Sequence, residues 1–180
     1  PYPCCRTTHH AIDGALMLRE KADLEKVERI LVETYEVGVL QCGSQGYPSS
    51  AVEAKFSIPY TVAAALVRGN VSLAEFAPEV IGDPLIKSLA NLVQVTADPL
   101  FTSRYPDRWG CRLRLIYKDA SELAVQVDDM SGSVAKPLTE EQEKRKFEGV
   151  AGEGIGAENA RKLLRTIMEI EKLDVLKQLL

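Results

Sequence analysis

The first part of the chain shows a helical pattern of apolar positions, followed by an alternating one. From His10 to about Glu20 the pattern repeats at steps of three and four residues, which predicts an amphipathic helix capped by Thr7 or Thr8. The repeating positions are Ile12, Ala15, Leu16 and Arg19. The stretch VERILVETY (Val27–Tyr35) then alternates, which predicts a strand of a sheet with one well-buried face. The residues expected on that buried face are Ile30, Val32 and Thr34.

Further stretches carry boundary signals. SIPYTVAAALVRG (Ser57–Gly69) has a capping serine, a proline in its first turn, an alanine-rich body and a terminal glycine, which predicts a mostly buried helix. Asp83 followed by Pro84 predicts a second, shorter helix, and VQVTAD (Val93–Asp98) predicts a strand. CRLRLIY and ELAVQV alternate strictly on either side of the turn Lys118–Ser121, which predicts a β-hairpin.

The last third of the chain returns to helical patterns. Thr139 and Gln142 have the spacing of a capping box, and apolar residues at helical spacing predict a helix through about Glu171. GEGIG (Gly152–Gly156) follows a helical stretch and predicts a turn between helices. Strands that are separated unevenly, with a hairpin among them, predict a single α+β domain over residues 1–180. We expect a mostly antiparallel sheet of about four strands, covered by helices on one side.

Composition narrows the class of protein. The 22 basic and 26 acidic residues are interleaved and give a net charge of -4, without the basic stripe that binds nucleic acid. No apolar run approaches the roughly 20 residues of a membrane-spanning helix, so we expect a cytoplasmic protein with no membrane partner. The four cysteines are too scattered for a disulfide framework, and we expect reduced thiols and no metal site. Because the chain starts without methionine, we expect it to be part of a longer polypeptide.

Titratable residues gather where the first helix begins, between Cys4 and Asp13. His9 and His10 are the only histidines, and each is either a general acid or base, or a capping or core residue. Adjacent helical residues face about 100° apart, so only one of the two can point into a given cleft. Arg6 either binds a carboxylate through two hydrogen bonds or is solvated in its loop. Asp13 either orients the imidazole of His9 or forms an exposed helix pair.

The stretch AKFSIPY (Ala54–Tyr60) places Lys55 and Tyr60 on either side of a tight Ser–Pro junction. Tyr60 falls in the first turn of the following helix, where its hydroxyl can face a cleft and hold or protonate a developing oxyanion. The alternative is a core aromatic residue whose hydroxyl has a partner inside the protein.

Together, YPCCRTTHHAIDGALMLRE and AKFSIPYTVAAALVRG, followed by LTEEQEKRKF and a C-terminal helix ending LDVLKQLL, resemble the C-terminal half of the MmgE/PrpD family. That family includes 2-methylcitrate dehydratases, cis-aconitate decarboxylases and iminodisuccinate epimerases. The resemblance implies the smaller α+β domain of a homodimeric two-domain enzyme, whose larger helical domain lies mainly in an N-terminal part absent from this chain. It also implies chemistry without metal or organic cofactor, in which a proton is removed and returned next to a carboxylate.

The resemblance also implies which residues form the site. His9 matches the family's active-site histidine and Tyr60 its active-site tyrosine, which makes both candidate catalytic residues, with Arg6, Lys55 and His10 as candidate substrate-binding residues. We expect the rings of His9 and Tyr60 to converge on one anion pocket at the edge of the domain. The expected function is that of a lyase domain acting on a small di- or tricarboxylic acid, inactive as an isolated chain. An epimerase or isomerase of the same family, or a non-catalytic dimerisation module, is the alternative.

Overall fold

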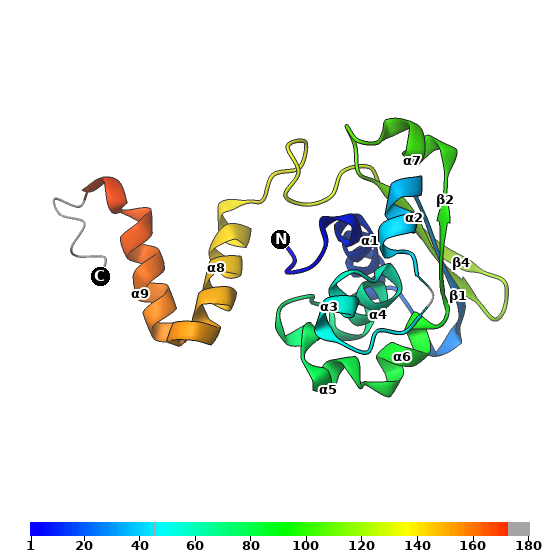
Figure 1. Ribbon diagram of the computed structural model, residues 1–180, viewed down its shortest axis with the longest axis horizontal. Coiled ribbons are helices and arrows are strands. Elements are labelled where there is room, and N and C mark those ends of the chain that lie inside the picture. Colours follow the sequence, from blue (N-terminus) through cyan, green and yellow to red (C-terminus); the bar gives the residue numbers. More distant parts are fainter. Residues whose placement is uncertain (45, 173–180) are drawn as a thin grey trace. The chain divides into compact units, whose positions relative to one another are not determined.

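The computed structural model describes residues 1–44 and 46–172 (Figure 1). Tyr2–Lys136 form one compact unit, and the chain from Pro137 onward belongs to a second. A single domain over residues 1–180 therefore stays a prediction. The stretch LDVLKQLL, expected to end a C-terminal helix, lies outside the described residues.

A four-stranded mixed sheet is the centre of the unit Tyr2–Lys136, with the strand order β2-β1-β3-β4. Strand β1 (Val27–Thr34) pairs in parallel with β2 (Val93–Ala97) and antiparallel with β3 (Cys111–Tyr117). The predicted hairpin is confirmed, because β3 pairs antiparallel with β4 (Glu122–Val127). Only the β1–β2 pairing is parallel among these described strands, so the predicted mostly antiparallel sheet of an α+β fold is confirmed as well.

The inner face of the sheet is apolar and is covered by helices. Ile30 lies opposite Val93 on one side and Leu115 on the other, and all three side chains are fully buried. Helix α1 (His9–Arg19) packs on β3 and β4, while α4 (Ile58–Arg68) packs on β2 and on α1 (Figure 1). The alternation that predicted one buried face of β1 is thus explained by the two helices on that face.

The opposite face of the sheet carries charged residues. Glu33 of β1 lies 3.6 Å from Arg112 and 3.5 Å from Arg114, both on β3. Arg114 also lies 3.6 Å from Glu122 of β4. These partly exposed ion pairs cross the strands, and each of them contributes little stability by itself.

Most of the predicted helix starts are confirmed by their hydrogen bonds. Ser57 accepts a hydrogen bond from the Tyr60 backbone N–H, and Asp83 caps its helix in the same way. Thr139 and Gln142 form the predicted capping box. The remaining helices are η1 Arg6–Thr8, η2 Leu24–Lys26, α2 Glu36–Cys42, α3 Ala51–Lys55, η3 Ala74–Phe76, α5 Pro78–Ile81, α6 Pro84–Ala90, α7 Pro99–Arg104, α8 Glu140–Ile155, α9 Ala157–Met168 and η4 Ile170–Lys172.

The start of α1 differs in detail from the prediction. Thr8 is its N-cap residue but makes no side-chain capping bond. Its hydroxyl donates instead to the carbonyl of Cys5 at 2.8 Å, and the hydroxyl of Thr7 donates to Gln41 of α2. Both threonines therefore fasten the N-terminal segment to its surroundings.

The second unit contains the hairpin of α8 and α9. Helix α8 continues to Ile155, so the turn predicted for Gly152–Gly156 is confined to Gly156, which has a φ of 83°. Ala160 is the buried residue of this hairpin among the residues that the structure describes. No described helix of either unit is long and apolar enough to cross a membrane.

Candidate functional site

The segment from Tyr2 folds back over the beginning of α1 and covers His9. The Tyr2 ring packs edge-on against the His9 ring, with the centroids 5.1 Å apart. His9 Nε2 lies 3.4 Å from the carbonyl oxygen of Cys4. Because the His9 side chain is 7% exposed, the imidazole is nearly closed off from solvent within this unit.

Asp13 contacts the same segment through Tyr2 and is also buried. Its Oδ1 accepts a hydrogen bond from the Tyr2 hydroxyl at 2.6 Å, and its Oδ2 accepts one from the Ser131 backbone N–H at 2.6 Å. The ammonium group of Lys136 lies 4.0 Å from the same Oδ2. The expectation of an exposed helix pair at Asp13 is therefore wrong, because its carboxylate joins the first helix to the loop after β4 instead.

Burial changes the protonation of the groups at this helix start. It lowers the pKa of His9 to about 4 and that of His10 to about 3. Both imidazoles are therefore neutral at pH 7, the form that can accept a proton. Burial also raises the pKa of the Cys4 thiol to about 11, so this thiol is protonated at neutral pH.

The His10 side chain lies deeper in the interior of the unit than that of His9. Its side chain is completely buried, and its Nε2 lies 3.4 Å from the hydroxyl of Thr34. Its ring packs edge-on against Tyr35, and its Nδ1 has no hydrogen-bond partner among the described atoms. His10 is thus part of the core of this unit, and the expectation that it binds substrate stays a prediction.

Tyr60 occupies a separate part of the unit, in the first turn of α4. Its side chain is fully buried, and its hydroxyl donates a short hydrogen bond to the carbonyl of Glu75. Its ring packs beside Phe76, and the ammonium group of Lys55 lies over that same Phe76 ring, 5.6 Å from the centroid. Within residues 1–44 and 46–172, no ring contact or hydrogen bond joins Tyr60 to His9, so their convergence on one pocket stays a prediction.

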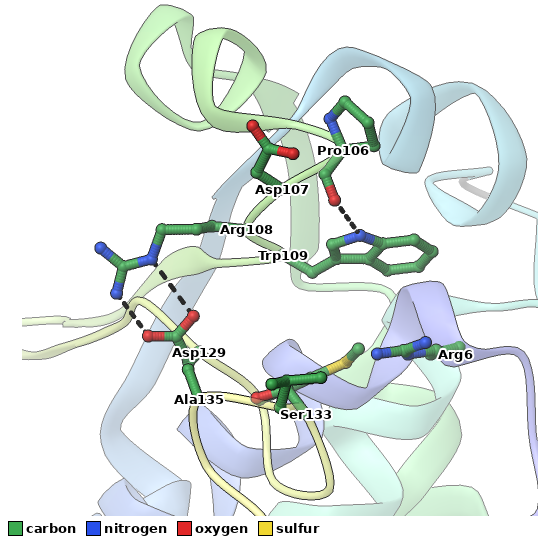
Figure 2. A pocket seen from close by; sticks show the side chains of 10 residues that line it. Arg6, Pro106, Asp107, Arg108, Trp109, Asp129, Ser133 and Ala135 are labelled. Carbon is green, nitrogen blue, oxygen red and sulfur yellow. Dashed lines mark hydrogen bonds and ion pairs between the residues drawn. The ribbon is translucent and has the colours of Figure 1, made fainter.

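A cavity of about 640 Å³ opens between two loops of the unit Tyr2–Lys136 (Figure 2). Its lining comes from Arg6 of η1, from residues 106–109 before β3, and from the segment 129–135 after β4. The two loops meet because Cys111, at the start of β3, pairs with Val127 at the end of β4. We call this cavity the Arg6 pocket.

Arg6 is placed in its pocket by Trp109. The guanidinium carbon lies 5.0 Å from the centroid of the Trp109 ring, a cation–π contact. The Trp109 ring is itself fixed, because its Nε1–H donates to the carbonyl of Pro106 at 2.9 Å (Figure 2). No ion pair of Arg6 is found within the described part of the chain, so its N–H donors are available to a carboxylate.

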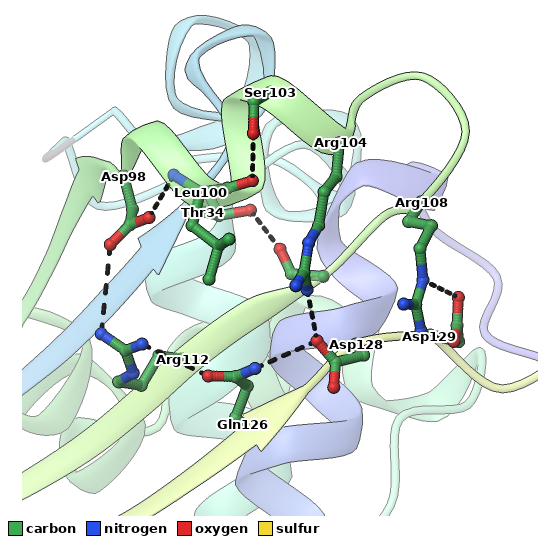
Figure 3. A network of polar contacts seen from close by, with 11 residues as sticks. Thr34, Asp98, Leu100, Ser103, Arg104, Arg108, Arg112, Gln126, Asp128 and Asp129 are labelled. Atoms are coloured by element: carbon green, nitrogen blue, oxygen red, sulfur yellow. Dashed lines mark hydrogen bonds and ion pairs between the residues drawn. The ribbon is translucent and has the colours of Figure 1, made fainter.

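Arginine–aspartate pairs hold the two loops together (Figure 3). Arg108 makes two hydrogen bonds to Asp129, one of them from Nε at 3.2 Å. Arg104 donates to Asp128 at 2.8 Å. Both pairs connect the chain before β3 with the chain after β4, so they fix the width of the Arg6 pocket.

Sequence patterns did not point to the residues around Arg6. The loops 106–109 and 129–135 have no helical or alternating pattern, and their pairing depends on contacts between distant residues. The signal that was present is the single tryptophan of the chain, Trp109, beside Arg108 and Asp107.

In the described residues, no group of three or more His, Cys, Asp or Glu side chains is arranged to hold a metal ion.

Comparison with known proteins gives one family and several relatives. The family model of the MmgE/PrpD C-terminal domain matches residues 2–172. The cis-aconitate decarboxylase of Mus musculus is 25% identical over 181 residues, which cover 96% of this chain and 36% of that protein. The 2-methylcitrate dehydratase-like protein oryR of Aspergillus oryzae is 25% identical over 171 residues, covering 87% of this chain and 34% of that protein. The chain thus spans about a third of the length of these relatives.

Proposed function

Because the chain belongs to the MmgE/PrpD family, as its C-terminal domain, we propose that it is one domain of a cofactor-independent lyase acting on a small di- or tricarboxylic acid. The names of its relatives, a cis-aconitate decarboxylase and a 2-methylcitrate dehydratase-like protein, support this class of substrate. The proposed reaction moves a proton at the carbon next to a carboxylate: in loss of water the proton leaves that carbon as hydroxide leaves its neighbour, and in loss of carbon dioxide a proton is returned to carbon.

The observation that carries this proposal is the free guanidinium of Arg6. It lies over the Trp109 ring at a cavity of about 640 Å³, and no carboxylate of the described residues forms an ion pair with it. A substrate carboxylate can accept two parallel hydrogen bonds from such a group, which fixes its orientation as well as its position. Arg6 is therefore the proposed anchor for one carboxylate.

His9 and Lys55 are proposed to act beside this anchor. His9 begins α1, directly after the short helix that carries Arg6, and its neutral imidazole is the proposed acid/base group. Lys55 is joined to the same segment, because its carbonyl accepts a hydrogen bond from the Cys5 backbone N–H at 2.9 Å. Its ammonium group adds positive charge, which favours an anionic substrate.

Tyr60 has a conditional role in this proposal. Its hydroxyl donates to the carbonyl of Glu75, so it can donate a hydrogen bond to the substrate only if the bond to Glu75 is broken. A catalytic Tyr60 would therefore require a local rearrangement of the chain around Glu75. A purely structural Tyr60 would require none.

We propose that the rest of the site comes from an N-terminal helical domain, and that the enzyme is a homodimer. Relatives are about three times as long as the matched region, which supports a further domain. The second unit supports it as well, because its helices leave large apolar side chains exposed. Val150 is 50% exposed, Ile155 46% and Met168 53%.

Solvent deuterium exchange tests the proposed proton removal whatever its product. The full-length protein that contains this chain is incubated in D₂O with 2-methylcitrate, cis-aconitate and related di- and tricarboxylic acids, and the products are followed by proton NMR. We expect either loss of water with disappearance of the carbon-bound proton, or loss of carbon dioxide with one deuterium delivered to carbon. Exchange with inversion alone would identify the epimerase of the same family. Absence of water loss, of carbon dioxide loss and of deuterium exchange with every acid would contradict the proposal and favour a dimerisation module.

A further inference from the structure

Among the described residues that line it, the Arg6 pocket offers one positive charge without an ion-pair partner. The other arginine in its lining, Arg108, is neutralised by the two hydrogen bonds to Asp129. Asp107 adds an exposed carboxylate to the same lining. Figure 2 shows Arg108 and Asp129 bonded to each other and apart from Arg6. The lining therefore suits a ligand that brings a single carboxylate to Arg6, because a second one would meet no free cation there.

The remainder of the lining is mainly apolar. The indole N–H of Trp109 is already used by the carbonyl of Pro106, so the ring presents carbon surface to the cavity. Ala135 also lines the cavity, and so does Val134, with a fully solvent-exposed side chain, whereas the side chain of Met130 is 1% exposed and offers a ligand almost no surface. A large apolar side chain in water gains free energy when a ligand covers it, about 25 cal/mol for each Å² removed from water.

A second carboxylate beside the one on Arg6 fits this lining poorly. A second carboxylate placed against the Trp109 ring would lose its hydration without gaining a partner, which is costly. Asp107 would repel it further. An alkyl or aryl group in the same place would bury apolar surface on both sides, and a cavity of about 640 Å³ has the size of pockets that accept drug-sized molecules.

We infer that the Arg6 pocket binds an amphipathic carboxylate, with one carboxylate on Arg6 and an alkyl or aryl group along Trp109 and Val134. The inference rests on the proposed function, since it takes Arg6 as the carboxylate anchor. It adds that the substrate carries an apolar substituent at this end. The further carboxylates of a di- or tricarboxylic substrate then lie outside this lining.

Trp109 makes the inference measurable, because it is the single tryptophan of the chain and lines the pocket. The chain 1–180 is titrated with hexanoate, adipate and hexan-1-ol at one salt concentration, and Trp109 fluorescence and calorimetric heat are recorded. Hexanoate and adipate have the same carbon skeleton, but adipate carries a second carboxylate at its far end. Hexan-1-ol has the same chain without a carboxylate. We expect hexanoate to bind at least about tenfold more tightly than either of the other two, a difference of about 1.4 kcal/mol.

Two variants and a control assign the effect to the pocket. Arg6→Gln should reduce hexanoate affinity to that of hexan-1-ol, and Val134→Ser should weaken hexanoate while leaving adipate unchanged. Both side chains are exposed, so neither change disturbs the core. Arg29→Gln removes an exposed arginine of β1 outside the pocket and should change nothing.

Three results would overturn the inference. An affinity for adipate equal to or above that for hexanoate would show that the apolar substituent is wrong, while the Arg6 anchor and the proposed function stand. Hexanoate binding that is unaffected by Arg6→Gln would place the ligand elsewhere. Absence of binding by every probe would show that the pocket takes no such ligand. Failure of the proposed function gives a different pattern, with hexanoate bound through Arg6 but neither turnover of the acids nor deuterium exchange in the full-length protein.

Discussion

The backbone N–H of Ser131 donates to Asp13 Oδ2 at 2.6 Å, which ties the loop that lines the Arg6 pocket to the first helix. The other oxygen of the same carboxylate accepts the Tyr2 hydroxyl, and Tyr2 covers His9. One buried carboxylate thus holds both the cover of His9 and a wall of the pocket.

Replacing Asp13 should loosen both the Tyr2 ring that covers His9 and the loop that lines the Arg6 pocket. In Asp13→Asn the two hydrogen bonds lose their charge, and one of the amide positions cannot accept, so we expect a loss of about 1–3 kcal/mol in the free energy of unfolding. Urea denaturation of the chain followed by circular dichroism measures it. Glu28→Gln, at an exposed position of β1, is the control. Equal stability of Asp13→Asn and the control would contradict the bracing role.

The buried histidines predict an acid-dependent loss of stability. Their folded pKa values, about 4 for His9 and about 3 for His10, lie below the ordinary value of 6.5, so the unfolded chain binds protons more readily. The stability that the neutral rings provide is therefore complete above about pH 6.5 and is lost as pH falls below it.

Each histidine should contribute up to about 1.4 kcal/mol per pH unit to this slope. Denaturation between about pH 7 and 5, above the ordinary carboxylate range, measures it. His10→Gln should remove the contribution of one proton, up to about 1.4 kcal/mol per pH unit, from the slope of unfolding free energy against pH, even if the variant is less stable. A free energy of unfolding that does not change over this range would show that the histidines are not buried.

A comparison of Tyr60 with Tyr47 distinguishes a structural role of Tyr60 from a catalytic one. Tyr60 and Tyr47 both donate their hydroxyls to backbone carbonyls, of Glu75 and Ile81 respectively. Removing either hydroxyl leaves a carbonyl without its partner, so Tyr60→Phe and Tyr47→Phe should each lose about 1–3 kcal/mol of stability. A catalytic Tyr60 predicts that turnover of the full-length protein falls by orders of magnitude in Tyr60→Phe alone. Similar turnover of the two variants would make Tyr60 a structural residue.

The incomplete site predicts that the chain of residues 1–180 does not catalyse the reaction by itself. The Arg6 pocket and His9 supply groups from one domain, and the proposed function places further acid/base groups in a second one. Incubation of the chain alone with 2-methylcitrate, followed by absorbance of the unsaturated product, should show no turnover. Appreciable dehydration by the chain alone would contradict the two-domain site.

The sequence predicts much of the fold because the fold follows local rules. The alternation of β1 predicts its buried face, and the caps at Ser57, Asp83 and Thr139 predict where helices begin, since each cap bonds within a few residues. The start of α1 departs from the rule because Thr8 bonds to the preceding segment instead.

The site is predictable only in part. The density of titratable residues before α1 indicates Arg6 and His9, but the Arg6 pocket depends on pairs such as Arg108 with Asp129, which are 21 positions apart. Burial is also set by packing: the same first-turn position that lets a tyrosine face a cleft places Tyr60 against Glu75 and Phe76. No periodic pattern records contacts of this kind.

The steady-state kinetics of Arg6→Gln in the full-length protein test the central claim, that Arg6 binds the carboxylate of the substrate, most directly. Loss of a charge-assisted pair of hydrogen bonds predicts a decrease in kcat/KM of about 10- to 100-fold, mainly through KM, with partial recovery in Arg6→Lys. The folded state should be unaffected, because the Arg6 side chain is exposed. A kcat/KM equal to that of the unmodified enzyme would contradict the claim.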